Sequence, residues 1–438
     1  MSDRRRGPAR ATAELLRPAW MSRDVTIVVA ARAAMSAARA LSAIVVPIYL
    51  ALIGFSAVRL GLLFLAVAAA STLLTAGVGL LADRVGRKPF LVGLPLLAVG
   101  AALTFSFRVP QTALFVAAAL GSFGRGSGAG AGAIGPYAPA ESALASDHTP
   151  ARFRNAVFGR LGFASALGAL IGSLLAGLAG RTHRPGAAAL AGFRPAFLAV
   201  AALALVAGVV ALWIEDAGPP RRRERRRPAF PRRSAGLLAR LWATNTVNGL
   251  AVGMFGPFVT YWFFRRYGVG AGTIGLLYAV INLATMASVL SAAEIARRAG
   301  LVRTIVGGRT LQALLLVPMA LAPSFVLAGA IYLVRMLAQR LSLPLRQSYT
   351  MAMAHPEERA AVAGLSNLPS QAASAASPTL AGYLFDHVSL ALPFELAGAL
   401  QLANAWLFFA FFRHLRPEEE RLATAEPSVE PAAGPPSP

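Results

Sequence analysis

The sequence predicts an all-α membrane protein whose twelve transmembrane helices form two pseudo-symmetric bundles of six. Three observations support this fold class. Hydrophobic residues make up 56% of the chain and charged residues only 14%, whereas soluble domains carry about 25% charged residues. The apolar residues form continuous runs long enough to cross a bilayer, unlike the alternating pattern of a membrane β-barrel. A polar linker divides these runs into two sets of six.

Each apolar run is expected to form one transmembrane helix. The fourth, tenth and eleventh runs are rich in Gly, Ser, Pro or Arg, which favours helices that line a cavity rather than face lipid. The expected spans are 25–53, 57–82, 89–107, 112–138, 155–179, 192–214, 237–264, 271–293, 302–322, 325–348, 360–385 and 391–413.

Charge and composition divide the chain into five parts. The bundles occupy residues 25–214 and 237–413, and residues 215–236 form an Arg- and Pro-rich linker. Arginines gather in this linker and in the basic tail 1–24, which places both termini in the cytoplasm of a plasma (inner) membrane. The tail 414–438 is rich in Pro, Glu and Ala, which predicts disorder. The first apolar run is too long for a cleavable signal peptide.

The two halves carry a weak internal repeat, which is common in transporters. When the first half is aligned with the second at one constant offset, four positions pair in the same order: Pro139 with Pro344, Glu141 with Arg346, Gly159 with Gly364 and Gly177 with Gly382. The order of the matches supports two related bundles.

Several functions are disfavoured by what the sequence contains. The net charge is +23, but the arginines lie between apolar runs and form no basic helix suited to nucleic acid. There are no cysteines, the five histidines are scattered, and no phosphate-binding loop motif is present. We therefore expect no enzyme activity, no cofactor and no metal site. The expected partners are a small-molecule substrate, a proton or other coupling ion, and the lipid bilayer, with the chain acting as a monomer.

The segment 79–91, GLLADRVGRKPFL, is a charged loop between two apolar runs. It resembles the signature loop of the major facilitator superfamily, which joins the second and third membrane helices. Nine positions match the family pattern in order: Gly79, Leu81, Ala82, Asp83, Arg84, Gly86, Arg87, Lys88 and Leu91.

This resemblance implies a secondary transporter that works by rocker-switch alternating access, with its substrate cavity lined by spans 1, 4, 7 and 10. It also implies a cytoplasmic latch between the two halves, formed by Gly79, Asp83, Arg84, Gly86, Arg87 and Lys88. Gly79 would allow close helix packing and Gly86 a tight turn. A solvated topology loop is the alternative. The stretch 168–177 is similar to the family's antiporter motif, but Ser173 replaces its proline, which leaves the transport direction open.

Arginines inside the apolar runs are the candidate substrate ligands. Arg39, Arg125 and Arg335 lie near the middle of spans 1, 4 and 10, where each costs about 2.5–3.5 kcal/mol to insert. They could hold an anionic substrate, or bond to helix carbonyls and to Glu141. Glu141 is the best internal proton carrier, because a carboxyl in an apolar site takes up a proton more readily.

Polar amides on two other spans are further candidates. Asn245 and Asn248 on span 7 and Gln371 on span 11 could line the cavity between the halves or bond helix to helix. The leading functional hypothesis is proton-coupled efflux of hydrophobic, drug-like compounds. Transport of an organic or inorganic anion is the alternative, and a non-transporting sensor on the same fold is the third.

Overall fold

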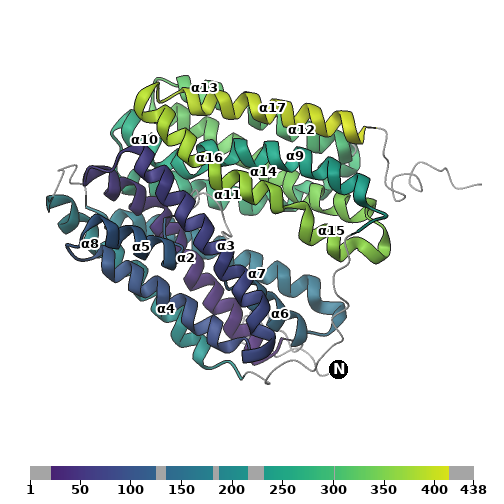
Figure 1. Cartoon of the computed structure of the whole chain (residues 1–438), viewed down its shortest axis with the longest axis horizontal. Helices are drawn as coiled ribbons and strands as arrows, with labels where there is room; N and C mark the ends of the chain where they lie inside the picture. Colours follow the sequence, from purple (N-terminus) through teal and green to yellow (C-terminus); the bar gives the residue numbers. More distant parts are fainter. Residues whose placement is uncertain (1–20, 125–134, 181–186, 216–230, 300, 414–438) are drawn as a thin grey trace, which may run out of the picture.

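The computed structural model describes residues 21–124, 135–180, 187–215, 231–299 and 301–413, and this part of the chain contains helices and turns but no strand. Figure 1 shows two helical bundles side by side. The first comprises α2 (Arg23–Leu52), α3 (Ala57–Val85), α4 (Lys88–Phe105), α5 (Gln111–Gly121), α6 (Ala138–Asp147), α7 (Arg154–Leu175) and α8 (Ala187–Leu212).

The second bundle follows the linker. It comprises α9 (Ala235–Phe255), α10 (Val259–Tyr267), α11 (Ala271–Ala299), α12 (Leu301–Leu314), α13 (Leu316–Leu321), α14 (Phe325–Met353), α15 (Arg359–Ser366), α16 (Leu368–His387) and α17 (Leu392–Phe412). Within the described ranges, eight helical segments are long and apolar enough to cross a membrane.

The predicted all-α fold is confirmed, and the predicted spans follow the helices in order. Span 4 corresponds to two helices, α5, which ends at Gly121, and α6, which runs beyond the expected boundary to Asp147. The sequence of α6 is polar and therefore did not indicate a helix inside the bundle, yet Glu141 on α6 is buried there. Spans 7, 9 and 11 each consist of two helices. In span 7 the break falls at the short turn Gly256–Phe258, where Pro257 cannot donate the helical hydrogen bond.

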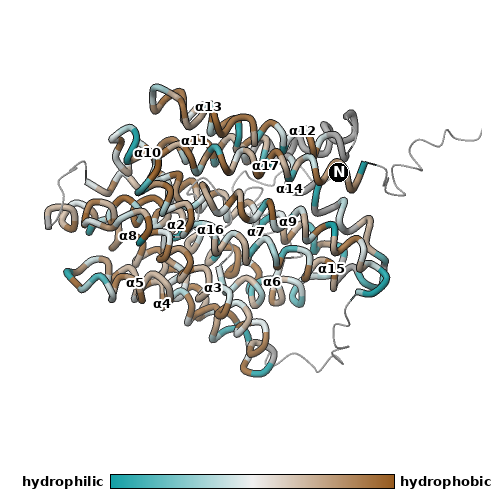
Figure 2. The backbone as a smooth tube through the Cα atoms, turned by 45° about the horizontal axis from the view of Figure 1, so that its top comes forward, coloured by the Kyte–Doolittle hydropathy of each residue, from teal (hydrophilic) through white to brown (hydrophobic). Residues whose placement is uncertain are grey.

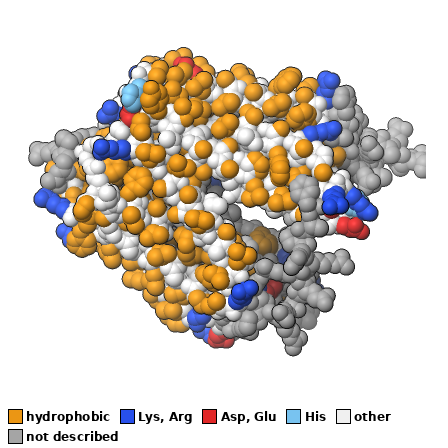
Figure 3. Space-filling view, viewed as in Figure 1, with side chains coloured by type: hydrophobic (Ala, Val, Ile, Leu, Met, Phe, Trp, Pro, Cys, Tyr) orange, Lys and Arg blue, Asp and Glu red, His pale blue; other side chains and the backbone are white. Residues whose placement is uncertain are grey.

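The connecting turns lie at two opposite ends of the molecule. The linker end carries residues 86–87, 148–153 and 354–358, and the far end carries residues 53–56, 106–110, 268–270 and 388–391. Hydrophobic side chains cover the visible surface between these ends, and the charged side chains gather at the ends (Figure 3). The backbone coloured by hydropathy shows the same apolar helices and polar turns (Figure 2). This distribution suits a bilayer between the two ends.

Small residues bring the first and fifth spans of each bundle into backbone contact. A Cβ added at Gly168 or Gly172 of α7 would overlap the backbone of α2. A Cβ added at Gly249 or Gly253 of α9 would overlap α16. Close approach of this kind is how helices associate in lipid, where burial of apolar surface drives little association. The equivalent helix pairs in both bundles agree with the internal repeat.

The two bundles touch at the far end and diverge toward the linker end (Figures 1 and 3). Phe64 of α3 packs against Phe258 with ring centroids 5.3 Å apart. Asn282 of α11 donates a hydrogen bond to Ser173 of α7 at 3.3 Å. A Cβ at Gly61 of α3 would overlap the carbonyl of Pro378 in α16. The path between the bundles is thus closed at the far end and open at the linker end.

Candidate substrate cavity and gates

The largest described cavity lies in the second bundle, on the side of the linker end. Its volume is about 660 Å³, counting space open to solvent. Asn245 of α9 lies in its wall, donates to the carbonyl of Ser366 at 2.6 Å and accepts from Arg346 at 2.7 Å. The amide therefore fixes the guanidinium at the cavity surface. The lining residues are Leu241, Asn245, Arg346, Thr350, Ala363, Ser366, Asn367 and Phe408.

A second polar cavity of about 480 Å³ lies beside the first, and Arg346 lines both. Asn248 lines this second cavity and accepts a hydrogen bond from the side chain of Asn404 at 3.3 Å. Gln312 donates to Ser342 at 3.2 Å. The walls come from α9, α12, α14 and α17, and the lining residues are Asn248, Val252, Arg309, Gln312, Gln339, Ser342, Arg346, Gln401 and Asn404. No carboxylate belongs to either lining.

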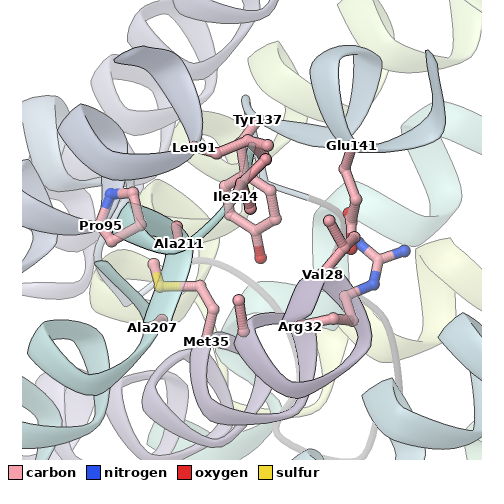
Figure 4. A pocket seen from close by; sticks show the side chains of 11 residues that line it. Val28, Arg32, Met35, Leu91, Pro95, Tyr137, Glu141, Ala207, Ala211 and Ile214 are labelled. Atoms are coloured by element: carbon pink, nitrogen blue, oxygen red, sulfur yellow. The ribbon is translucent and has the colours of Figure 1, made fainter. Parts of the chain in front are cut away.

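The first bundle contains a smaller and mainly apolar cavity of about 310 Å³. Figure 4 shows Glu141 and Arg32 turned toward each other in its wall, with the Tyr137 ring beside them. Their charged groups are 2.8 Å apart, and both side chains are at most 10% exposed. Val28, Met35 and Ile214 are among the apolar residues that complete the wall. The only carboxylate of the described cavities is therefore neutralised by an arginine.

The arginines predicted to share one site lie in different places. Arg39 lies against Tyr137 and the backbone of Gly135 in the first bundle. Arg335 lies in the second bundle, is fully buried, and stacks on the ring of Phe255 at 4.1 Å. Neither lines a described cavity. Arg125 is outside the described residues.

The predicted amides divide in a similar way. Asn245 and Asn248 line cavities, whereas Gln371 is exposed and lines none of those described. Sequence reasoning missed Arg309 and Arg346 as cavity residues. The repeat carried a signal for Arg346, because it aligns with the buried Glu141. For Arg309 the signal was its spacing from Gln312, which puts both polar side chains on one helix face.

Comparison with known proteins decides the family. The sequence profile of the Major Facilitator Superfamily matches residues 28–243 and, as a second copy, residues 241–436. The chain belongs to the major facilitator superfamily. It is therefore a multi-pass membrane protein of the transporter type. No curated protein matches the sequence.

Solved superfamily structures share the fold at low sequence identity. A POT family peptide transporter superposes with a TM-score of 0.70 at 13% identity, over 90% of this chain and 98% of that one. A bacterial homologue of the human lysosomal transporter Spinster, inward-facing and occupied, gives 0.67 at 14% identity, over 93% and 97%. The nucleoside transporter NupG gives 0.67 at 12% identity, over 90% and 100%.

The superfamily segment 79–91 turns at a glycine in its middle. Gly86 ends α3 with φ +95°, a backbone conformation that residues with a Cβ rarely adopt. Lys88 then begins α4, and Arg84 is exposed. A Cβ at Gly79 would meet open space, so no helix packs closely there in this conformation. The side chain of Asp83 is outside the described part of the structure.

Arg87 is the loop residue whose partner is clear. Its guanidinium donates to Asp147 at the end of α6, at 2.6 Å, and the arginine is 9% exposed. Both residues belong to the first bundle, so this contact stiffens that bundle. The latch between bundles that the superfamily resemblance implies for Asp83 and Arg87 stays a prediction, to be tested in the conformation closed at the linker end.

The far end is closed by a carboxylate on a helix terminus. Asp386, near the end of α16, accepts hydrogen bonds from the backbone N–H groups of Ala57 at 3.0 Å and Val58 at 2.9 Å. These two residues begin α3 in the other bundle. The first N–H groups of a helix lack partners within the helix and carry a partial positive charge. Asp386 therefore caps α3 across the bundle boundary, and we call this contact the far-end cap.

A second carboxylate ties the end of the linker to the second bundle. Glu358, just before α15, accepts hydrogen bonds from the N–H groups of Arg233 at 3.1 Å and Ser234 at 2.7 Å. Desolvation opposes its ionisation, but the side chain of Ser234 together with these two N–H groups outweighs it and lowers the pKa of Glu358. Since Ser234 directly precedes α9, the carboxylate fixes where the second bundle begins.

Proposed function

We propose that this chain is a secondary active transporter that works by alternating access and that the structure represents its cytoplasm-open conformation. The linker end faces the cytoplasm in this proposal, because arginines concentrate in the linker and in the N-terminal tail. The far-end cap and the packing of Phe64 on Phe258 close the opposite side. Similarity to an inward-facing Spinster homologue supports the assignment.

The proposed substrate is a small organic molecule with an anionic group. The observation that carries this proposal is Arg346, which Asn245 holds at 2.7 Å in the wall of the 660 Å³ cavity. Thr350, Ser366 and Asn367 add polar groups to that wall, which contains no carboxylate. Guanidinium groups bind carboxylates and phosphates through paired hydrogen bonds. A cationic substrate would meet only repulsion from Arg346.

Efflux of hydrophobic compounds, the leading hypothesis from the sequence, is the second candidate. It is favoured by the cavity of the first bundle, whose wall is apolar apart from Arg32, Tyr137 and Glu141. An apolar group of such a compound could contact this wall if the cavity widened, but the charge of Glu141 is already neutralised by Arg32. The charge balance of the larger cavity makes the anion the better supported substrate.

The Arg32–Glu141 pair is the proposed site of proton coupling. Protonation of Glu141 would remove the charge that neutralises Arg32 at 2.8 Å and leave a buried cation without a negatively charged partner, which is unfavourable. Proton binding would thereby change the stability of this bundle's packing. Glu141→Gln is expected to abolish uptake driven by a pH gradient while substrate exchange at equal pH continues. Loss of both activities would mean that Glu141 has only a structural role.

The first experiment measures the thermal stability of the purified protein against organic anions and lipophilic cations. Stabilisation by an anion that disappears in Arg346→Gln, but persists in Arg240→Gln, would support the anion site. Arg240 is a suitable control because it is an exposed arginine on α9. Stabilisation by lipophilic cations that is unchanged in Arg346→Gln would instead support the second candidate. Proteoliposome transport of the stabilising compound, under pH gradients of either sign, then gives coupling and direction.

A further inference from the structure

The 480 Å³ cavity lies within the second bundle, not in the path between the bundles. Its walls come from α9, α12, α14 and α17. The proposed substrate cavity is also lined by the second bundle alone, but α15 contributes Ala363 and Ser366 to its wall and α12 contributes no residue. Only Arg346 belongs to both. We call the 480 Å³ cavity the inner cavity; a ligand in it would lie beside the substrate cavity and contact the same arginine.

Arg309 is the unexplained group of the inner cavity. It is 8% exposed, and its Nη1 atom is buried with no hydrogen-bond partner among the described residues. Its guanidinium carbon lies 5.1 Å from the centroid of the Phe408 ring. The neighbouring charge that acts on it is Arg346, which is also positive. Two guanidinium groups thus line one cavity, and the Nη1 atom of Arg309 lacks a hydrogen-bond acceptor among the described residues.

The rest of the wall supplies hydrogen-bond donors rather than negative charge. Gln312, Gln401 and Asn404 are all buried amides around the cavity. Each carries an NH₂ group that can donate to an anion. Water could solvate the amides, but it would leave the two positive charges without compensation. A buried cation needs a partner of opposite charge, and the lining contains none.

We propose that a small inorganic anion, a halide or an oxyanion, resides between Arg309 and Arg346 in this cavity. The anion neutralises both guanidinium groups and accepts hydrogen bonds from the surrounding amides. It also holds Arg346 where Asn245 contacts it, so occupancy of the inner cavity influences the substrate cavity. The site itself does not depend on what the chain transports.

The test is a titration of the detergent-purified full chain with chloride, nitrate and phosphate. Thermal unfolding is followed at constant ionic strength, with gluconate as the bulky replacement anion. We expect a saturable rise of the unfolding temperature in the wild type and none in Arg309→Gln. Arg309→Lys keeps the charge but loses the planar donor group, and its half-saturating concentration should rise about ten-fold. Arg240→Gln removes an exposed arginine and should respond as the wild type does.

The proposal is overturned if all three anions act alike in the wild type and in Arg309→Gln, since that is a general salt effect. It is also overturned if phospholipid copurifies with the wild type, is lost in Arg309→Gln and makes added salt ineffective, because a lipid phosphate would then occupy the site. If Arg309→Gln does not fold, the change in the half-saturating anion concentration of Arg309→Lys serves as the test of the proposal. If no organic anion or lipophilic cation stabilises the protein, this result is unaffected, because the probes of the inner cavity are inorganic salts.

Discussion

The far-end cap predicts how the conformational equilibrium responds to one substitution. In the structure, Asp386 accepts two hydrogen bonds from the start of α3 in the opposite bundle. Asp386→Ala removes both acceptors and the negative charge at a helix N-terminus. Loss of an N-terminal cap costs about 1 kcal/mol, which corresponds to a change of about five-fold in an equilibrium constant. Because the contact exists only when the far end is closed, the population should move toward far-end opening.

Distances between spin labels can measure this shift. The chain contains no cysteine, so a single pair introduced at Arg108 and Arg266 would label one exposed far-end site in each bundle. The ratio of the longer-distance to the shorter-distance population should rise about five-fold in Asp386→Ala. Asp386→Asn, which retains one acceptor oxygen, should fall between this variant and the wild type.

The control removes a different carboxylate from the far end. Glu395 lies in the first turn of α17 and has no hydrogen bond to the first bundle among the described residues, so Glu395→Gln should leave the distances unchanged. If Glu395→Gln and Asp386→Ala shift the distances equally, general surface charge is responsible and the cap argument is wrong. Unchanged distances in Asp386→Ala would show that apolar packing alone keeps the far end closed.

Three other substitutions test separate parts of the argument. Gly61→Ala should hinder far-end closure and reduce transport, because the added Cβ would overlap the backbone of α16. Gly77→Ala on the same helix is the control, since its Cβ would meet open space. In thermal unfolding this control should be neutral or should stabilise the protein by up to about 1 kcal/mol. Arg87→Gln should lower the free energy of unfolding by about 1 kcal/mol or less, because its partner Asp147 is half exposed. Adding Asp147→Asn to this variant should lower the free energy of unfolding little further. Fully additive effects of the two substitutions would mean that the pair does not interact. Glu358 has a lowered pKa in the folded protein. Its contribution to stability is therefore complete above the ordinary carboxyl pKa and is lost as the pH falls through the pKa of the folded state. Glu358→Gln should reduce the acid sensitivity of thermal unfolding, and identical acid profiles of variant and wild type would contradict this.

The fold was largely predictable because lipid imposes strong rules on sequence. Helices that cross a bilayer must be apolar along most of their length, so runs such as 57–82 can be recognised from the sequence. The exception was α6, whose run of Ala, Ser, Glu and Asp resembles a soluble loop. Its burial comes from contacts with other helices, with Arg32 supplying the charge for Glu141. A local pattern carries no information about such a distant partner.

The candidate site was less predictable for the same reason. Depth along a helix can be read from the sequence, and it drew attention to Asn245 and Asn248, which line described cavities. The direction in which a side chain points depends on the neighbouring helices. Arg335 lies mid-span as expected, yet it stacks on Phe255 and lines no described cavity. Arg346 lies closer to the linker end, and its role became visible only when Asn245 was found beside it.

The burial of Arg335 has a consequence for the energetics of the transport cycle. Its three guanidinium nitrogens have no hydrogen-bond partner within the described structure, and arginine keeps its charge in proteins. A unit charge that crosses a 100 mV membrane potential changes the free energy by about 2.3 kcal/mol. If the second bundle tilts so that Arg335 crosses one tenth of the field, the two conformations shift by about 0.2 kcal/mol relative to each other. Voltage would then bias the resting conformation, even for a substrate whose own movement carries no net charge.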